Sequence, residues 1–268
     1  GRYSTYVGSS PLATPSILML IAHVEQDGVW LLDGGMYSLV RALRNLGENL
    51  GVRYHFNANV DRINCAQGKV IGLTVDGSDV SGLDAIVFNG DRSALGAGLL
   101  GEQVVDAASL IKPSKRGLSA IIWCVRARTS GMPLAYHNVF FAEDYPKEFK
   151  NLFQKREIVE SPTVYVCAQD RLSNKTPEGP ERLLVLINAP ADGDTVDITS
   201  GREDYFWDKA NTVLKDCGLE LTAEPADRVM MSPSIFSDLY PGTGGSLYGQ
   251  ASHGIFSPFL RPGSASPV

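Results

Sequence analysis

A glycine pattern that binds phosphate in some proteins occurs in the sequence as GAGLLG, at residues 96–101. In such sites a strand runs directly into the first glycine and a helix leaves the last, so that free backbone N–H groups meet the phosphate. Here the nearest strand-like run ends at Phe88, and residues 91–95 intervene. We therefore interpret residues 96–101 as a glycine-rich helix end. Residues 241–246, PGTGGS, could also hold an anion, but a flexible loop near a pocket is favoured.

Side chains that could bind a metal or act as a nucleophile are scattered. The histidines are His23, His55, His137 and His253. They have no H-x-x-x-H or H-E-x-x-H spacing, so no metal site is predicted.

The G-x-S-x-G turn of a hydrolase is absent, because tyrosine occupies its last position after Ser246, and Ser-His-Asp catalysis is not indicated. The cysteines form no C-x-x-C pair, and Cys124 and Cys167 are predicted to be buried thiols in apolar strands. No catalytic residue is identified.

The helices and strands that would position a functional site are predicted most clearly between residues 28 and 100. Gly34 and Gly35 allow a sharp turn before a predicted helix at residues 36–50. Apolar side chains recur along this helix at the helical period, which predicts one buried stripe. The stripe consists of Leu39, Val40, Leu43, Leu46 and Leu50. Strands are predicted where β-branched and aromatic residues gather, at residues 28–32, 52–56, 60–63, 70–75 and 85–88.

A second group of elements follows residue 101. Strands are predicted at residues 118–126, 138–141, 163–168, 183–188 and 228–231. Helices are predicted at residues 145–156 and 203–217, besides an apolar helix at residues 16–25. This alternation favours a sheet covered by helices.

The composition excludes some partners. A net charge of −6 and a pI near 5.3 argue against nucleic acid, whose phosphates require clustered Lys and Arg. The apolar runs are shorter than the roughly 18 residues of a membrane-spanning helix. Nothing in the sequence indicates the number of subunits.

Several short motifs follow one another along the chain. The central ones are GGM at residues 34–36, NVDRI at residues 59–63 and AIVFNGD at residues 85–91. Others are RYSTYVGSSP at residues 2–11, HNVFF at 137–141, YVCAQD at 165–170, PEG at 177–179 and SLYG at 246–249. In their order and spacing they resemble the FAD-dependent amine oxidase superfamily. Within it they are most similar to bacterial carotenoid desaturases of the hydroxyneurosporene or methoxyneurosporene dehydrogenase branch.

The resemblance implies an α/β fold with α+β character in a second lobe. One part would be an incomplete Rossmann-like FAD/NAD(P)-binding domain, and the other a mixed-sheet substrate-binding domain with helices. Residues 28–100 are expected to form the middle of the FAD domain, residues 1–27 and 101–252 the substrate lobe, and residues 253–268 a connecting loop. The two terminal FAD-binding segments of such proteins have no counterpart here, so the sequence is expected to be a fragment.

The resemblance also implies two sets of site residues. Those beside FAD are Val60, Asn89, Gly90, Asp91, Gly34 and Gly35. Those lining an apolar substrate cavity are Tyr3, Tyr6, Trp123, His137, Phe140, Phe141 and Tyr165. For each aromatic residue, a place in an ordinary core remains the alternative.

The implied activity is FAD-dependent dehydrogenation of a C–C bond in an acyclic carotenoid, such as a hydroxylated or methoxylated neurosporene. The alternatives are a non-redox isoprenoid-binding or escort protein of the same fold, as among Rab-escort relatives, and an inactive fragment. This chain alone is expected not to retain FAD. A cytoplasmic protein is expected, bound peripherally at the inner face of a membrane through residues 16–24 or 255–260.

Overall fold

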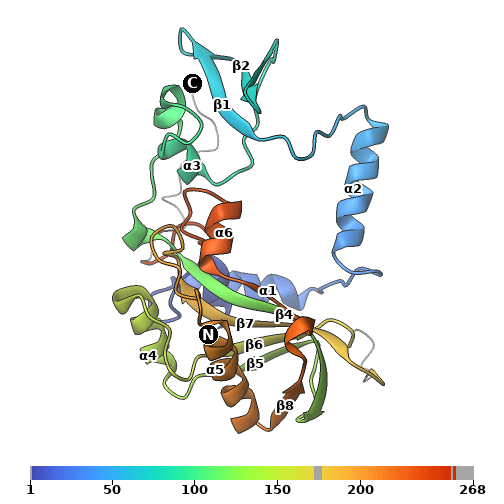
Figure 1. Ribbon diagram of the computed structural model, residues 1–268. Helices are drawn as coiled ribbons and strands as arrows, with labels where there is room; N and C mark the ends of the chain where they lie inside the picture. The colour runs from blue at the N-terminus through green and yellow to red at the C-terminus, as the bar shows by residue number, and fades with distance from the viewer. Residues whose placement is uncertain (1, 172–176, 255, 258–268) are drawn as a thin grey trace.

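The computed structural model describes residues 2–171, 177–254, 256 and 257. Figure 1 shows a larger sheet in the lower part of the molecule and a smaller one at the top, with helix α2 standing on an arm beside them. The two sheets share no strand. The predicted α/β class is confirmed, while the predicted domain limits remain a prediction.

The larger sheet has the strand order β5-β6-β7-β4-β8, and β9 also pairs with β4. Its strands are β4 (Leu118–Gly131), β5 (His137–Phe140), β6 (Val164–Ala168), β7 (Glu181–Pro190), β8 (Leu219–Thr222) and β9 (Arg228–Met231). Strands were predicted at all of these places except β8. Every pairing among the described strands is antiparallel, whereas the resemblance implied a mixed sheet.

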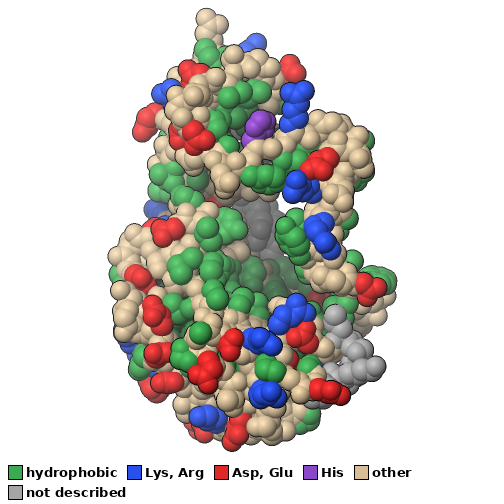
Figure 2. Space-filling model, turned by 45° about the vertical axis from the view of Figure 1, so that its right-hand side comes forward, with side chains coloured by type: hydrophobic (Ala, Val, Ile, Leu, Met, Phe, Trp, Pro, Cys, Tyr) green, Lys and Arg blue, Asp and Glu red, His purple; other side chains and the backbone are tan. Residues whose placement is uncertain are grey.

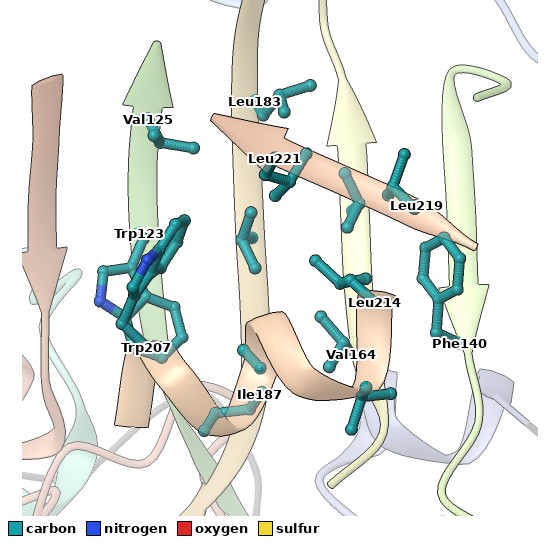
Figure 3. Close-up of a cluster of buried hydrophobic side chains, with 14 of the residues drawn as sticks. Trp123, Val125, Phe140, Val164, Leu183, Ile187, Trp207, Leu214, Leu219 and Leu221 are labelled. Atoms are coloured by element: carbon teal, nitrogen blue, oxygen red, sulfur yellow. The ribbon is translucent and has the colours of Figure 1, made fainter. Parts of the chain in front are cut away.

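One face of this sheet is closed by helix α5 (Glu203–Asp216). Phe206, Trp207, Ala210, Val213 and Leu214 of α5 are buried against the sheet. The apolar period of the sequence predicts this face except for Trp207, and it also predicts Cys217, which is exposed. Figure 3 shows Trp123 of β4 beside Trp207, and their rings meet edge to face with centroids 5.5 Å apart. This cluster is the main hydrophobic core.

Short helices surround the sheet. They are α4 (Tyr145–Lys150), which continues into a π-helical turn (Asn151–Lys155), α6 (Pro233–Leu239), and the 3-10 turns Pro113–Lys115 and Pro225–Asp227. Asp144 and Ser232 cap α4 and α6 by accepting backbone N–H groups of Lys147 and Ile235. In both helices proline occupies an early position that needs no N–H donor.

The smaller sheet consists of β1 (Val60–Ala66), β2 (Lys69–Val75) and β3 (Ser78–Ser81). Asp76 and Gly77 both have positive φ, which gives the tight turn expected between β2 and β3. The 3-10 turn Glu102–Ala107 lies against β1, and helix α3 (Arg92–Gly96) packs on that turn. The Ile63 N–H on the outer edge of β1 donates to Leu100 O at 3.0 Å.

Three predicted strands do not form. Residues 28–32, 52–56 and 85–88 are irregular, and Trp30 and Val87 are 82% and 93% exposed. Their β-branched and aromatic residues favour a strand, but a strand requires a partner, and none pairs with them among the described residues.

Helix α2 (Tyr37–Asn49) forms where it was predicted, but its apolar stripe is exposed rather than buried. The arm holds the helix away from the body (Figure 1). Figure 2 shows hydrophobic side chains on both sides of a hollow between the arm and the body. The helical period therefore predicted the position of the apolar stripe correctly, but the prediction that the stripe is buried was wrong.

The N-terminal region comprises 3-10 helices Arg2–Val7 and Ser16–Met19, followed by α1 (Leu20–Gln26). Ile17, Met19, Leu20 and Val24 of this region are each more than 40% exposed. Across the described part of the chain, no helix is sufficiently long and apolar to span a bilayer.

Candidate functional site

Three segments that are distant in sequence cross at the start of β4. The Gly117 N–H donates to Gly249 O at 2.7 Å, and the Leu247 N–H donates to Leu118 O at 3.0 Å. A Cβ on Gly117 would lie 2.9 Å from Gly249 O and 3.1 Å from the Cα of Gly8. Glycine is therefore required here because three backbones approach too closely for a side chain.

A cavity of about 680 Å³ lies at this crossing, and we call it the junction cavity. Residues 248–254 form much of its wall, together with Asp91, Arg92 and Lys115. Its lining is mixed: charged and polar side chains alternate with apolar surface, which includes Ile111 and Phe256.

A second cavity of about 580 Å³, the edge cavity, lies between the smaller sheet and the end of α6. Val60, Asn89, Gly90 and Asp91, four of the predicted cofactor residues, line it together. Asp91 also lines the junction cavity, so this residue stands between the two.

Asp91 places a carboxylate in the wall of the edge cavity. Its carboxylate accepts the Ser93 N–H at 2.8 Å and caps the N-terminus of α3. A helix N-terminus attracts phosphate through free N–H groups and its dipole. At α3 a carboxylate already occupies that position, and its negative charge opposes a pyrophosphate.

The glycine-rich segments have structural roles. Gly96 ends α3, and a Cβ there would lie 2.7 Å from Ala108 O, which supports the interpretation of residues 96–101 as a helix end. The loop at residues 241–246 is packed rather than flexible. Thr243 is buried, and a Cβ on Gly245 would lie 2.2 Å from Pro233 O. Gly34 and Gly35 shape the turn before α2 and line neither of the two cavities described above.

The face of the larger sheet opposite α5 carries two rows of side chains, and we call it the open sheet face. Strand register defines both rows. The first is Val139, Tyr165, Leu186, Ile122 and Met231, and the second is His137, Cys167, Leu184, Cys124 and Val229. Each row spans four strand spacings, about 19 Å. Most of these side chains are partly or fully exposed, so this face can receive an elongated apolar ligand.

His137 and Tyr165 form a polar contact at one end of the open sheet face, with His137 Nδ1 and the Tyr165 hydroxyl 2.7 Å apart. Partial burial lowers the pKa of His137, and the Glu25 carboxylate of α1 raises it by a smaller amount. α1 therefore lies on this side of the sheet. Burial also raises the pKa of the neighbouring Cys167 thiol, which keeps it protonated at neutral pH.

Two other residues predicted to line the substrate cavity lie on the opposite face of the sheet, because successive side chains of a strand point to opposite faces. Trp123 and Phe140 point to the α5 side and are 2% and 4% exposed, so they belong to the core (Figure 3). Cys124, predicted to be buried, is exposed on the open sheet face because it follows Trp123 directly.

Tyr6 contacts Tyr248 edge to face, with ring centroids 6.5 Å apart, and so adjoins the junction cavity. Phe141 is 53% exposed just beyond β5. Tyr3 lies in the first 3-10 helix, and its side chain is outside the described part of the structure.

The sequence did not single out Lys115 or His253 as site residues. Both line the junction cavity. The chain crossing that brings them together joins segments more than 100 residues apart, and no local pattern marks it. The SLYG motif at residues 246–249 was the nearest signal, because it places glycine and tyrosine at the crossing.

Two antiparallel sheets that share no strand, together with the helices packed beside them, define an α/β protein. The chain belongs to the family of flavin-containing amine oxidoreductases, whose family model matches residues 16–265.

Curated relatives in this family act on carotenoids, according to their names. The chain is 43% identical to a hydroxyneurosporene desaturase of Rubrivivax gelatinosus, over 99% of this chain and 51% of that protein. It is 38% identical to the enzyme of that name from Cereibacter sphaeroides, over 98% of this chain and 52% of the relative. It is also 31% identical to a 1-hydroxycarotenoid 3,4-desaturase of a Flavobacterium species, over 97% of this chain and 53% of that protein. The chain thus spans about half the length of these relatives.

Proposed function

We propose that this chain contributes the carotenoid-binding lobe of an FAD-dependent desaturase that acts on an acyclic, hydroxylated carotenoid. The observation that carries the proposal is the open sheet face, two ordered rows of largely apolar side chains. The names of the relatives support the same substrate class.

The described residues fit only part of FAD. Val60 and Asn89 to Asp91 line the edge cavity, and we infer that their backbone would hold the adenine end. They offer no glycine-rich helix N-terminus for the pyrophosphate, and Asp91 already caps α3. When bound, FAD supplies the two-electron oxidation that turns a C–C single bond into a double bond. The residues of this chain hold and orient the polyene.

The open sheet face suits a polyene because its affinity would come from burial of apolar surface. Covering partly exposed side chains such as Leu184, Leu186 and Ile122 removes apolar area from water at about 25 cal/mol per Å². A stiff conjugated chain loses little conformational freedom on binding, so more of this free energy remains as affinity.

The hydroxyl group of the substrate belongs close to the reacting bond. In a 1-hydroxycarotenoid desaturated at carbons 3 and 4, the hydroxyl-bearing carbon and carbon 3 are two bonds apart, about 3 Å along the chain. We infer that this end binds in the junction cavity, because the cavity wall includes side chains that can hydrogen-bond a hydroxyl group, such as Gln250 and His253.

Peripheral binding at the inner face of a membrane is part of the proposal, because a carotenoid is stored in the bilayer. Exposed Ile17, Met19, Leu20 and Val24 form an apolar patch suited to that surface. Of the other predicted segment, residues 255 and 258–260 lie outside the described residues, while Phe256 is 70% exposed. Flotation of the protein with liposomes tests this, and a Leu20→Glu, Val24→Glu variant should float less; equal recovery of both would contradict it.

The activity is tested by absorption spectroscopy. The longest natural polypeptide that carries this sequence is incubated with FAD and a hydroxylated neurosporene. A longer conjugated system absorbs at longer wavelength, so a red shift of the carotenoid bands supports the desaturase. Carotenoid binding without any spectral change would instead indicate a carrier.

A further inference from the structure

His253 lines the junction cavity on one side and, on the other, a third cavity that Ser10 and Phe153 also line. The backbone on each side of it is held by the N-terminal segment, because the Ser252 N–H donates to Val7 O and the Gly254 N–H donates to Ala13 O. Its ring packs edge to face on Phe153 at 4.8 Å. These contacts orient the imidazole, although the residue as a whole is exposed.

The hydrogen bond to the ring determines its tautomer. The Ser10 backbone N–H donates to His253 Nε2 at 3.3 Å, so Nε2 acts as an acceptor and carries no proton. Partial burial, and secondarily the positive charge of Lys115, lower the pKa of His253, which keeps the ring neutral at pH 7. A neutral imidazole with a bare Nε2 carries its proton on Nδ1. No side chain or carbonyl among the described residues accepts that Nδ1–H.

We propose that the Nδ1–H of His253 donates a hydrogen bond to the hydroxyl oxygen of the carotenoid, and that this contact selects hydroxylated over unhydroxylated substrates. The inference rests on the proposed function, which brings the hydroxyl end into the junction cavity. It assigns His253 to substrate specificity, without a part in the chemical step.

Three of the other polar side chains of the cavity are less suited to this contact. The Ser257 hydroxyl donates to Gly254 O at 2.9 Å, and Arg92 reaches Ser109 O at 3.4 Å. Lys115 carries a strongly hydrated ammonium, whose desolvation against a neutral hydroxyl is costly. The Nδ1–H of His253 is neutral, so its desolvation costs less than that of an ammonium group, and it donates to no other group among the described residues.

Two substitutions separate the proposed role from a structural one. In His253→Asn the side-chain amide can occupy the place of Nδ1 and keep a donor there, but it does not reach the Ser10 N–H. In His253→Gln the amide oxygen can occupy the place of Nε2 and accept the Ser10 N–H, but the Nδ1 donor is lost. His253→Phe removes both groups and keeps the ring.

The measurement is the ratio of turnover of hydroxylated to unhydroxylated neurosporene, by the longest natural polypeptide with FAD. We expect His253→Gln and His253→Phe to lower this ratio about three- to tenfold, the effect of one hydrogen bond, and His253→Asn to preserve most of it. The inference would be overturned if His253→Gln kept the wild-type turnover ratio, or if all three variants lost it. It would also be overturned if none of the three variants changed the ratio.

Failure of the proposed function gives a different result. A wild-type protein that neither converts nor binds either carotenoid overturns the proposed function and this inference with it. Conversion of both compounds with an unchanged ratio in His253→Gln overturns this inference alone. As a readout independent of turnover, ¹⁵N NMR of the isolated chain should show a protonated Nδ1 and a bare Nε2 for His253; the opposite tautomer would also overturn the inference.

Discussion

The amide of Gly117 and the carbonyl of Gly249 are joined by a 2.7 Å hydrogen bond at the point where β4 begins and the junction cavity opens. This contact ties the larger sheet to residues 247–254, which form one wall of the cavity. The positions of Tyr248 and His253 therefore depend on the close approach of these two backbones.

Substitution of Gly117 by alanine should disturb this crossing. The new Cβ would lie 2.9 Å from Gly249 O and 3.1 Å from the Cα of Gly8, and neither backbone can move freely. We expect Gly117→Ala to lower the free energy of unfolding by about 1–3 kcal/mol, measured by urea denaturation. Gly179→Ala is the matched control, because a Cβ there meets nothing within 4 Å. Equal stability of the two variants would contradict this account of the crossing.

A buried ion pair makes stability depend on pH. The Arg171 guanidinium donates to Glu181 at 2.7 Å and 2.8 Å, and the Thr129 hydroxyl donates to it at 2.6 Å. Burial alone would raise the pKa of Glu181, but these donors hold it below its ordinary value. The carboxylate therefore contributes stability above the pKa of unfolded Glu, about 4.3, and that contribution is lost as pH falls through the lower pKa of the folded state.

Glu181→Gln tests this dependence. At pH 7 the variant should be less stable by about 3–5 kcal/mol, because Arg171 is left buried without a counter-charge. Below about pH 4 the difference between variant and wild type should narrow, as urea denaturation across pH would reveal. A difference independent of pH would show that Glu181 is not ionised in the folded protein.

The 268-residue chain, purified alone, should contain no bound flavin. The edge cavity offers a few backbone hydrogen bonds, each contributing about 0.5–1.5 kcal/mol, while immobilising a ligand costs about 4–15 kcal/mol. The Asp91 carboxylate at the start of α3 further disfavours pyrophosphate. The visible spectrum after incubation with FAD and desalting checks this, and flavin bands at stoichiometric intensity would refute it.

Local sequence patterns predicted most elements of the fold. The helical period located α2 and α5, and apolar β-branched runs located β4, β6 and β9. Strand β8 was missed because LELT is short and follows a helix directly. Residues 85–88 have the composition of a strand but do not form one. A strand forms only beside a hydrogen-bonded partner strand, and local composition does not show whether such a partner is present.

The site was less predictable, for two physical reasons. Successive residues of a strand face opposite sides, so Trp123 enters the core while Cys124 faces the open sheet face, and composition alone does not choose between the two. The junction cavity depends on contacts such as the one between Ser10 and His253, which are 243 residues apart. Only the fold reveals that these segments meet.

Binding of the polyene to the open sheet face is the central claim, and it is tested most directly by comparing two valine-to-glutamate variants in a carotenoid titration. Val229 is 63% exposed within the second row of that face, and Val196 is 56% exposed outside it. Both substitutions should leave folding intact, since both side chains are in water. We expect Val229→Glu to weaken hydroxyneurosporene binding at least about tenfold, because a charge would be buried against the polyene, and Val196→Glu to bind like wild type. Equal affinity of the two variants would contradict the claim.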